Sequence, residues 1–465
     1  MYAQNGMTTE EFARRLERLE SENASLKQQI TDEKEVSAPT PSDLDDFMYV
    51  LESPSVGNSV QDSVVFHFDP LPEASRQASG DRILNAIHDD VEAELARYKN
   101  WTWNKDSFTF TPYAWFFLTG VYESNWTVPG EYPFYVRPQF KGDEVSHTWF
   151  DMKATRIGAI VTAPESGALP GWRLGGGFEA DFQGKYVQEN EADFEMRKAY
   201  LDLKSDRWYF QFGQSWELVS LVFPPMLNWG FGAGSGNPGY RRPGFRMDRI
   251  FTLENGQFTI QTGVYSANTS NFTSLYNGTY TGKMGRTPDI QVRFERTWKE
   301  FGFWKDAMFA FGMRYGEKEF QQAEDRFSRD SWMFCLEGRI RFTDRMYLIG
   351  EWFTGSVIGN LAGAVFQDLN SETLEEVHAS GGWLAMVYDL TPKTHLVCGY
   401  SCDDPWNKDV CKGMRSFAYV GFANISYDVT QKLNMGIEYG YYATDYHDLG
   451  FAKSNHVTFA LNYRL

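Results

Sequence analysis

The sequence has no apolar run long enough to cross a membrane as an α-helix. One of its longest runs, residues 114–118, is far shorter than the ~18 apolar residues that a spanning helix requires. This excludes a helical membrane protein but leaves a closed β-barrel open, because strands that alternate apolar and polar residues keep the mean hydropathy low. Residues 1–5 also lack the basic and apolar regions of a signal peptide. We therefore expect either a cytosolic protein or a chain from which a targeting segment has been removed.

Basic residues, cysteines and histidines are scarce. The 44 Lys and Arg residues against 62 Asp and Glu residues give a net charge of −18, which argues against a nucleic-acid-binding protein. The seven histidines lack metal-ligand spacing, and four cysteines are too few for a disulfide scaffold, so we expect no metal and no cofactor. Cys402 and Cys411 flank a polar, turn-rich stretch and are candidates for one disulfide in an oxidising compartment; two free thiols are the alternative.

Composition divides the chain into an acidic head and an aromatic-rich body. Residues 1–100 carry 20 acidic and 9 basic residues but only 7 aromatic ones. The rest of the chain carries 42 acidic and 35 basic residues and 70 aromatic ones. We predict three parts: a coiled coil over residues 1–35, a linker over 36–100, and the body over 101–465.

Residues 8–34 predict a helix whose core positions are spaced alternately four and three residues apart. This heptad pattern is typical of a parallel coiled coil, in which one buried asparagine fixes the register. The Arg15-Leu16-x-x-Leu19-Glu20 pattern resembles short trimeric coiled coils and favours a homotrimer; a lone charged helix is the alternative. The predicted core positions are Phe12, Leu16, Leu19, Asn23, Leu26 and Ile30.

The linker contains two kinds of sequence. Residues 36–80 are rich in Ser, Pro and Asp and have few apolar runs. Residues 81–98 repeat apolar side chains at helical spacing, which predicts one amphipathic helix that packs against or inside the body.

From residue 101 onward the period of the apolar residues becomes that of a strand. In residues 454–465, for example, Val457, Phe459 and Leu461 point to one side, and His456 and Thr458 point to the other. The sixteen predicted strands are 107–120, 147–161, 172–184, 193–204, 207–216, 244–253, 257–266, 289–298, 306–315, 331–342, 345–355, 379–390, 394–401, 416–429, 432–442 and 454–465.

Long and short connections alternate between these strands, except for a weak point around the third strand. The odd-numbered connections average about 18 residues and the even-numbered ones about 4. This alternation is typical of bacterial outer-membrane barrels, whose extracellular loops are long and whose periplasmic turns are short. We predict an all-β fold: a transmembrane 16-stranded antiparallel β-barrel with an N-terminal periplasmic α-helical coiled coil. A large soluble sandwich or propeller is the alternative.

The longest predicted connection, residues 217–243, is too apolar and Gly-rich for a loop in water, so we expect it to fold into the barrel and narrow it. The arginines that follow it favour an anion-attracting constriction, because a guanidinium pairs with a carboxylate through two hydrogen bonds. Ion pairs with Glu217 and Asp248 are the alternative. The candidate pore residues are Arg241, Arg242, Arg246, Arg249, Arg173, Arg293, Glu179 and Asp181.

Three motifs resemble the DcaP-like outer-membrane porins: Gly213-Gln214-Ser215-Trp216, Phe223-Pro224-Pro225-x-x-Asn228-x-Gly230 and Gly239-Tyr240-Arg241-Arg242-Pro243. The resemblance implies a homotrimer of sixteen-stranded barrels in outer-membrane lipid that imports small anionic solutes such as dicarboxylates. It also implies an N-terminal coiled coil in the periplasm. The head of this chain is longer than in that family, which leaves the role of residues 36–100 open.

The function that we expect is passive diffusion through a porin, with no catalytic residues. Glu179 and Asp181 lie two positions apart on one strand face, and we interpret them as pore-lining charges and not as a catalytic pair. One alternative is a structural protein that links the outer membrane to the cell wall or a periplasmic partner through its stalk. Another is a barrel enzyme, which would need a nucleophile and a base side by side.

Overall fold

A computed structural model of the chain describes residues 103–105, 108–128, 132–138, 145–165, 169–184, 193–267, 287–302, 304–322 and 325–465. The predicted coiled coil, with Phe12, Leu16, Leu19, Asn23, Leu26 and Ile30, lies outside the described residues. So do the linker and the predicted helix over 81–98.

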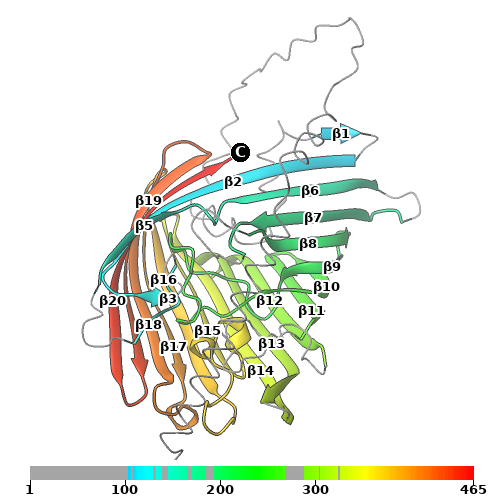
Figure 1. Cartoon of the computed structure of the whole chain (residues 1–465). Helices are drawn as coiled ribbons and strands as arrows, with labels where there is room; N and C mark the ends of the chain where they lie inside the picture. The colour runs from blue at the N-terminus through cyan, green and yellow to red at the C-terminus, as the bar shows by residue number, and fades with distance from the viewer. Residues whose placement is uncertain are drawn as a thin grey trace, which may run out of the picture. The chain divides into compact units, whose positions relative to one another are not determined.

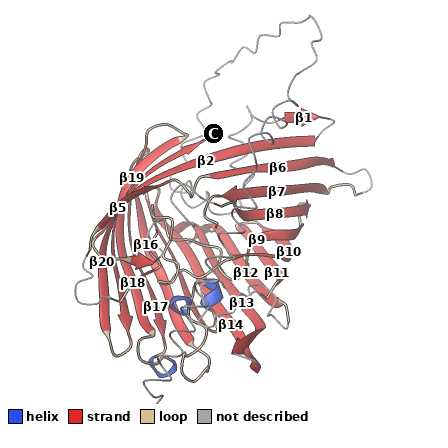
Figure 2. Cartoon of the chain, viewed as in Figure 1, coloured by secondary structure: helices blue, strands red, loops and turns tan. Residues whose placement is uncertain are grey.

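The described residues are almost entirely strands (Figure 1; Figure 2). The strands are β1 (Trp103–Lys105), β2 (Phe108–Glu123), β3 (Thr127–Val128), β4 (Tyr135–Val136), β5 (His147–Asp151), β6 (Arg156–Glu165), β7 (Arg173–Asp181), β8 (Glu195–Lys204), β9 (Trp208–Trp216), β10 (Arg241–Leu253), β11 (Gly256–Tyr265), β12 (Asp289–Phe301), β13 (Trp304–Gln322), β14 (Asp325–Thr343), β15 (Met346–Ser356), β16 (His378–Thr391), β17 (Thr394–Pro405), β18 (Arg415–Asp428), β19 (Leu433–Tyr446) and β20 (Gly450–Arg464). Three 3-10 turns accompany them: η4 (Gly359–Leu361), η5 (Ala364–Phe366) and η6 (Asn407–Asp409).

In the described part of the chain, no helix has the length and apolarity to span a membrane.

The sheet closes on itself. From β6 to β20 each strand pairs antiparallel with the next, and β2 pairs with β20 on one side and with β5 and β6 on the other (Figure 1). β5 and β6 pair with successive stretches of β2 and so occupy one position in the wall. Counted in this way the barrel has sixteen strands, and the predicted antiparallel barrel is confirmed. Closure gives each of the sixteen wall positions a partner on both sides, which is the condition for a sheet to cross a bilayer.

Each predicted strand coincides with one position of the observed wall, but the connections differ. Residues 166–172 and 182–194 separate β6, β7 and β8, so the alternation of short and long connections continues where the sequence left a weak point. The long loop expected between the ninth and tenth strands is instead mostly strand. β13 and β14 continue their pairing until Gln322 lies opposite Asp325, because the residues beyond Tyr315 keep pairing across the hairpin.

The two faces of the wall differ in burial. Along β14, Met333, Cys335 and Glu337 are nearly fully buried, whereas Phe334 and Leu336 between them are 41% and 50% exposed. In a closed sheet the buried, often charged face is the interior, and the exposed apolar face is the one that meets lipid. Trp383 on β16 faces the interior and is only 4% exposed.

The predicted disulfide between Cys402 and Cys411 is not formed in the structure. Cys402 and Cys411 are both free in the structure, as are the other two cysteines. Cys402 lies within β17, where it is paired with Gly382 and Tyr419, and the strand continues to Pro405. Cys411 follows η6, and its Sγ lies 3.1 Å from the hydroxyl oxygen of Ser371. The continuing strand therefore holds the two thiols in different surroundings.

Candidate functional site

The interior of the barrel carries most of the buried charge. Buried ionisable side chains are most frequent on one part of the wall, from β6 to β14. They include every buried arginine and lysine of the described residues, each at most 9% exposed: Arg156, Glu179, Asp181, Arg197, Arg242, Arg246, Asp248, Asp289, Arg293, Arg314, Lys318 and Glu337. We call this set the charged wall.

The segment between β9 and β10, residues 217–240, is buried along most of its length. Its backbone N–H groups donate to side chains that belong to distant strands. Leu218 and Val219 donate to Gln291 on β12, and Leu221 and Val222 donate to one carboxylate oxygen of Glu337 on β14, at 2.7 and 2.6 Å. A loop in water would leave these donors to solvent; here inward-facing side chains accept them.

The same segment reaches further around the barrel. The backbone N–H groups of Leu227 and Asn228 donate to the carboxylate of Glu438 on β19, at 2.7 and 3.1 Å. The Asn228 side chain also donates to the hydroxyl of Thr458 on β20. The segment thus contacts inward-facing residues of β12, β14, β19 and β20.

A second buried segment packs against it between β15 and β16. The N–H of Gly234 donates to the carbonyl of Ala362 at 2.9 Å, and the N–H of Gly239 donates to that of Leu361 at 2.7 Å. Gly234 has a φ of +71°, and a Cβ at this position would lie 2.2 Å from the Phe366 ring. Glycine is therefore required both by the backbone conformation and by the close approach of the two segments.

Two of the predicted pore arginines are held by ion pairs. Arg242 contacts Glu217 at 2.5 Å and Asp289 at 3.6 Å. Arg246 pairs with Asp248 through two hydrogen bonds, at 2.9 and 2.7 Å. These are the partners that the alternative interpretation of the sequence named, so both guanidinium groups have structural partners.

Arg293 is likewise paired. It donates twice to Glu337, at 2.9 and 2.6 Å, and it also contacts Glu295. Because Glu337 receives the backbone of residues 221 and 222 as well, this pair ties β12 to the buried segment.

The two predicted acidic residues, Glu179 and Asp181, both pair with the same arginine. Arg197 donates to Glu179 and to Asp181, both at 2.7 Å, and Glu179 also accepts a hydrogen bond from Tyr113. The sequence prediction missed Arg197 as the partner of these carboxylates.

The remaining predicted arginines lie apart. Arg241 pairs with Glu195 at 2.8 Å and stacks over the ring of Trp216. Arg173 is exposed at the start of β7. Arg249 lies on the opposite face of β10 from Arg246, with its guanidinium carbon 4.7 Å from the ring centre of Trp208. Our expectation that Arg249 lines the pore was therefore wrong, because alternate residues of a strand face opposite sides of the sheet.

Arg156 differs from every other arginine of the charged wall. It is 3% exposed, its Nε has no hydrogen-bond partner, and it forms no ion pair with a carboxylate among the described residues. Its guanidinium carbon lies 4.8 Å from the ring centre of Trp115 on β2 and 4.3 Å from that of Trp229 in the buried segment. Cation–π contact thus takes the place of a carboxylate.

A sequence signal for Arg156 exists, but it is weak. It begins a strand that is otherwise mainly apolar, and the interruption between β5 and β6 places it there. The alternation of residues predicts one uninterrupted strand over 147–161, in which Arg156 does not stand out.

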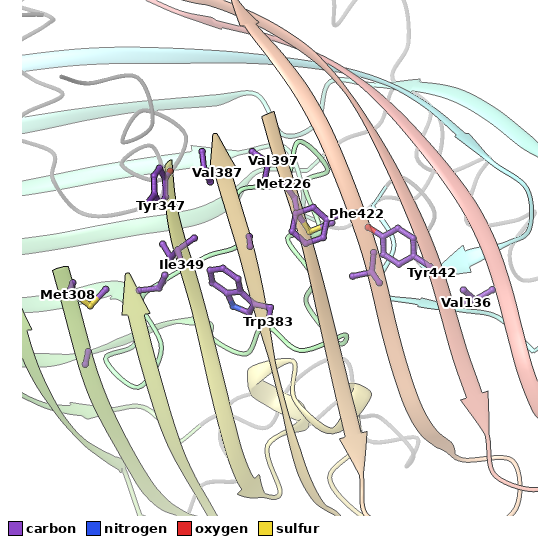
Figure 3. Packing of buried hydrophobic residues seen from close by; sticks show 14 of the residues in the cluster. Val136, Met226, Met308, Tyr347, Ile349, Trp383, Val387, Val397, Phe422 and Tyr442 are labelled. Carbon is purple, nitrogen blue, oxygen red and sulfur yellow. The ribbon is translucent and has the colours of Figure 1, made fainter. Parts of the chain in front are cut away.

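The strands from β15 to β19 carry a large apolar cluster on their inward face, beside a few buried polar side chains such as Glu351 and Glu438. Inward-facing side chains of β15 to β19 form one buried cluster with Val222 and Met226 of the segment 217–240 (Figure 3). We call the members of this cluster on β15 to β19 the apolar wall: Tyr347, Ile349, Trp383, Ala385, Val387, Val397, Val420, Phe422, Tyr442 and Tyr446.

Solved structures share this architecture. The outer membrane channel DcaP of Acinetobacter baumannii aligns with a TM-score of 0.64 and 15% identity over 78% of this chain and 99% of that one. The anion-selective porin from Comamonas acidovorans aligns with a TM-score of 0.50 and 10% identity, over 77% of this chain and all of that one. OmpT, an outer membrane protein of Vibrio cholerae, gives a TM-score of 0.50 and 12% identity, over 78% of this chain and 99% of that one.

No protein-family model matches the chain, and no curated protein sequence matches it either. The resemblance to DcaP-like porins is therefore confirmed at the level of the fold, a sixteen-stranded barrel like those of outer-membrane channels.

Proposed function

We propose that this protein is a bacterial outer-membrane porin through which small hydrophilic anions, such as dicarboxylates, diffuse passively. The observation that carries the proposal is Arg156, a buried cation inside the barrel that forms no direct ion pair with a carboxylate among the described residues. In a low-dielectric surrounding, a cation without a direct ion pair attracts passing anions more strongly than a directly paired one does.

The other charges of the interior support this choice of residue. Buried acidic side chains outnumber buried basic ones among the described residues, so a sum of charges would favour cations. However, the carboxylates are engaged: Glu337 and Glu438 accept backbone N–H groups, and Asp248 and Asp289 pair with arginines. The anion preference is therefore local to Arg156.

The segment 217–240 is the proposed constriction. Its hydrogen bonds to β12, β14, β19 and β20 support a position across the lumen, where it narrows the path for solutes. Trp229 of this segment stacks on Arg156, so the constriction and the proposed anion site share a residue.

We further propose a homotrimer whose residues 1–35 form a periplasmic coiled coil. The outward-facing apolar side chains of β7 to β9 support it, since Leu174, Leu201 and Phe212 are 51%, 62% and 69% exposed. Another copy of the chain could cover this apolar surface at a subunit interface, in place of lipid. Sizing of the full chain in mild detergent tests this, and a monomer would contradict it.

Arg156→Ala tests the proposed selectivity. We expect the reversal potential in a salt gradient across a planar bilayer to shift toward cations, by an amount that corresponds to a severalfold lower anion-to-cation permeability ratio. Arg249→Ala is the matched control, because it removes one arginine from the outer face of the same barrel. Equal reversal potentials for Arg156→Ala and Arg249→Ala would overturn the assignment, and the absence of any conductance in the wild type would overturn the porin itself.

A further inference from the structure

The outer face of the barrel contains a hollow that the channel does not use. It has a volume of about 650 Å³ and lies over β11 to β16. Its floor is formed by Gly338 on β14 and Gly350 on β15, which are direct partners in the antiparallel pairing. Two neighbouring positions without side chains leave the backbone bare in the middle of an otherwise apolar surface.

Large apolar side chains surround this floor. In the same cross-strand row, Phe309 precedes Gly338 and Leu384 follows Gly350. Trp352 lies toward the long connections and is 47% exposed. A second hollow of about 730 Å³ adjoins the first, and Leu348, Trp352 and Leu384 line both. The outer face thus offers two neighbouring apolar hollows with a shared wall.

Arg296 lies at one end of the cross-strand row formed by Phe309, Gly338, Gly350 and Leu384. Arg296 on β12 is the partner of Phe309 and lines the first hollow. Its guanidinium donates to the carbonyl oxygens of Thr297, at 2.9 Å, and of Asn255, at 3.3 Å. Asn255 lies in the short turn between β10 and β11, so the side chain bends toward that rim of the barrel, as basic residues do at a membrane boundary.

The charge at the other end is negative. Asp404 lines the second hollow and lies one residue before the end of β17, at the rim of the long connections. An anionic group is therefore attracted to the Arg296 end and repelled from the Asp404 end. A guanidinium has five N–H donors, of which two are used here, so it can still bind a phosphate.

We propose that these hollows bind one phospholipid, with its two acyl chains over Gly338 and beside Trp352 and its phosphate at Arg296. The proposal rests on the outer-membrane location of the barrel, whose short-turn leaflet contains phospholipid. It does not depend on which solutes pass through the lumen. Two hollows with one shared wall match a lipid with two chains better than a single fatty acid, and each buried methylene adds to the affinity.

The test uses the full chain, reconstituted with palmitoyl-oleoyl phosphatidylglycerol, re-extracted into mild detergent and examined by native mass spectrometry. We expect the wild type to retain one phospholipid per chain. Gly338→Leu, whose Cβ lies 3.3 Å from the Phe309 ring, fills the floor and lowers retention by about tenfold. Gly421→Leu is the matched control: this outward glycine of β18 has no atom within 4 Å of its Cβ position, and we expect wild-type retention.

Arg296→Gln provides a second, independent variant, because it leaves the hollow unchanged and removes the charge. We expect it to retain less phosphatidylglycerol than the wild type. Equal retention by the wild type, Gly338→Leu and Arg296→Gln would overturn the proposal, as would retention of lipopolysaccharide alone. Heat-modifiable migration in gel electrophoresis checks that each barrel is closed. Channel conductance, measured on the same samples, separates a failure of this site from a failure of the porin function.

Discussion

The two walls of the barrel interior hold the same buried segment with different shares of hydrogen bonding and packing. On the charged wall, side-chain acceptors such as Gln291 and Glu337 bind its backbone N–H groups, and Arg293 holds Glu337 in turn. On the apolar wall, Glu438 also accepts two of its N–H groups, but Met226 adds packing against the cluster of inward-facing side chains that includes Val397 and Phe422 (Figure 3). Directional hydrogen bonds fix where the chain runs, whereas packing contributes stability in proportion to the buried area.

This difference changes the meaning of the interior charges. Arg242, Arg246 and Arg293 all have carboxylate partners, so they hold the wall and the segment together. Arg156 has none among the described residues. A charge in a barrel interior is thus not a pore charge by position alone; its partners decide how much of its field reaches a passing ion.

The largest loss of stability is expected for Glu337→Ala on the charged wall. The change leaves Arg293 without its main partner and removes the acceptor of two backbone N–H groups. Because breaking a buried ion pair from one side leaves a charge unpaired, we expect the free energy of unfolding to fall by about 3–5 kcal/mol. Urea unfolding of the folded barrel, followed by tryptophan fluorescence, measures this. Single-channel conductance should rise, because the segment is no longer fixed there.

Glu254→Ala is the control for this prediction. Glu254 is an exposed acidic residue in the short turn between β10 and β11, and its removal should change stability by less than about 0.5 kcal/mol. Similar stability losses in the two variants would show that Glu337 has no special role in anchoring the segment.

The fold could be predicted from the sequence because each strand of a barrel wall shows a local pattern of alternating apolar and polar residues. The alternation of apolar and polar residues located all sixteen wall positions, since each strand has one face toward lipid and one toward the interior. The ends of β13 and β14 could not be predicted from local pattern. Residues 316–330 are polar enough for a loop, and only their pairing with each other makes them strand.

The site was predicted only in part for a related reason. Sequence indicated which strands carry arginines, and alternation along β10 already places Arg249 on the opposite face from Arg246. The partner of Glu179 lies on a neighbouring strand, which local pattern does not identify. Arg156 is set apart by what it does not contact. Its two tryptophans, Trp115 and Trp229, are far from it in the chain, so no spacing rule could bring them together.

A smaller loss is expected for Met226→Ala on the apolar wall. Met226 is 2% exposed, and its truncation leaves a cavity against the wall, so we expect the free energy of unfolding to fall by about 2–3 kcal/mol. Met435→Ala, on the outward face of β19, is the control and should cost less, since lipid fills the space that the side chain leaves. The same urea titration measures both. A loss for Met226→Ala as large as that for Glu337→Ala would mean that packing anchors the segment as strongly as the hydrogen bonds do.

The smallest change in stability and in reversal potential is expected when both partners of one buried ion pair are replaced together. The double variant Arg246→Gln with Asp248→Asn keeps the size of both side chains and their capacity for hydrogen bonds, and it leaves the net charge of the interior unchanged. Replacing both partners of a buried ion pair is close to neutral, so we expect a stability change within about 1 kcal/mol and an unchanged reversal potential. Arg246→Gln alone leaves Asp248 without its cation and should cost more than the double variant. A reversal potential that shifts in the double variant toward cations, as in Arg156→Ala, would mean that paired arginines also set the selectivity, and the contrast between Arg156 and the paired arginines would be lost.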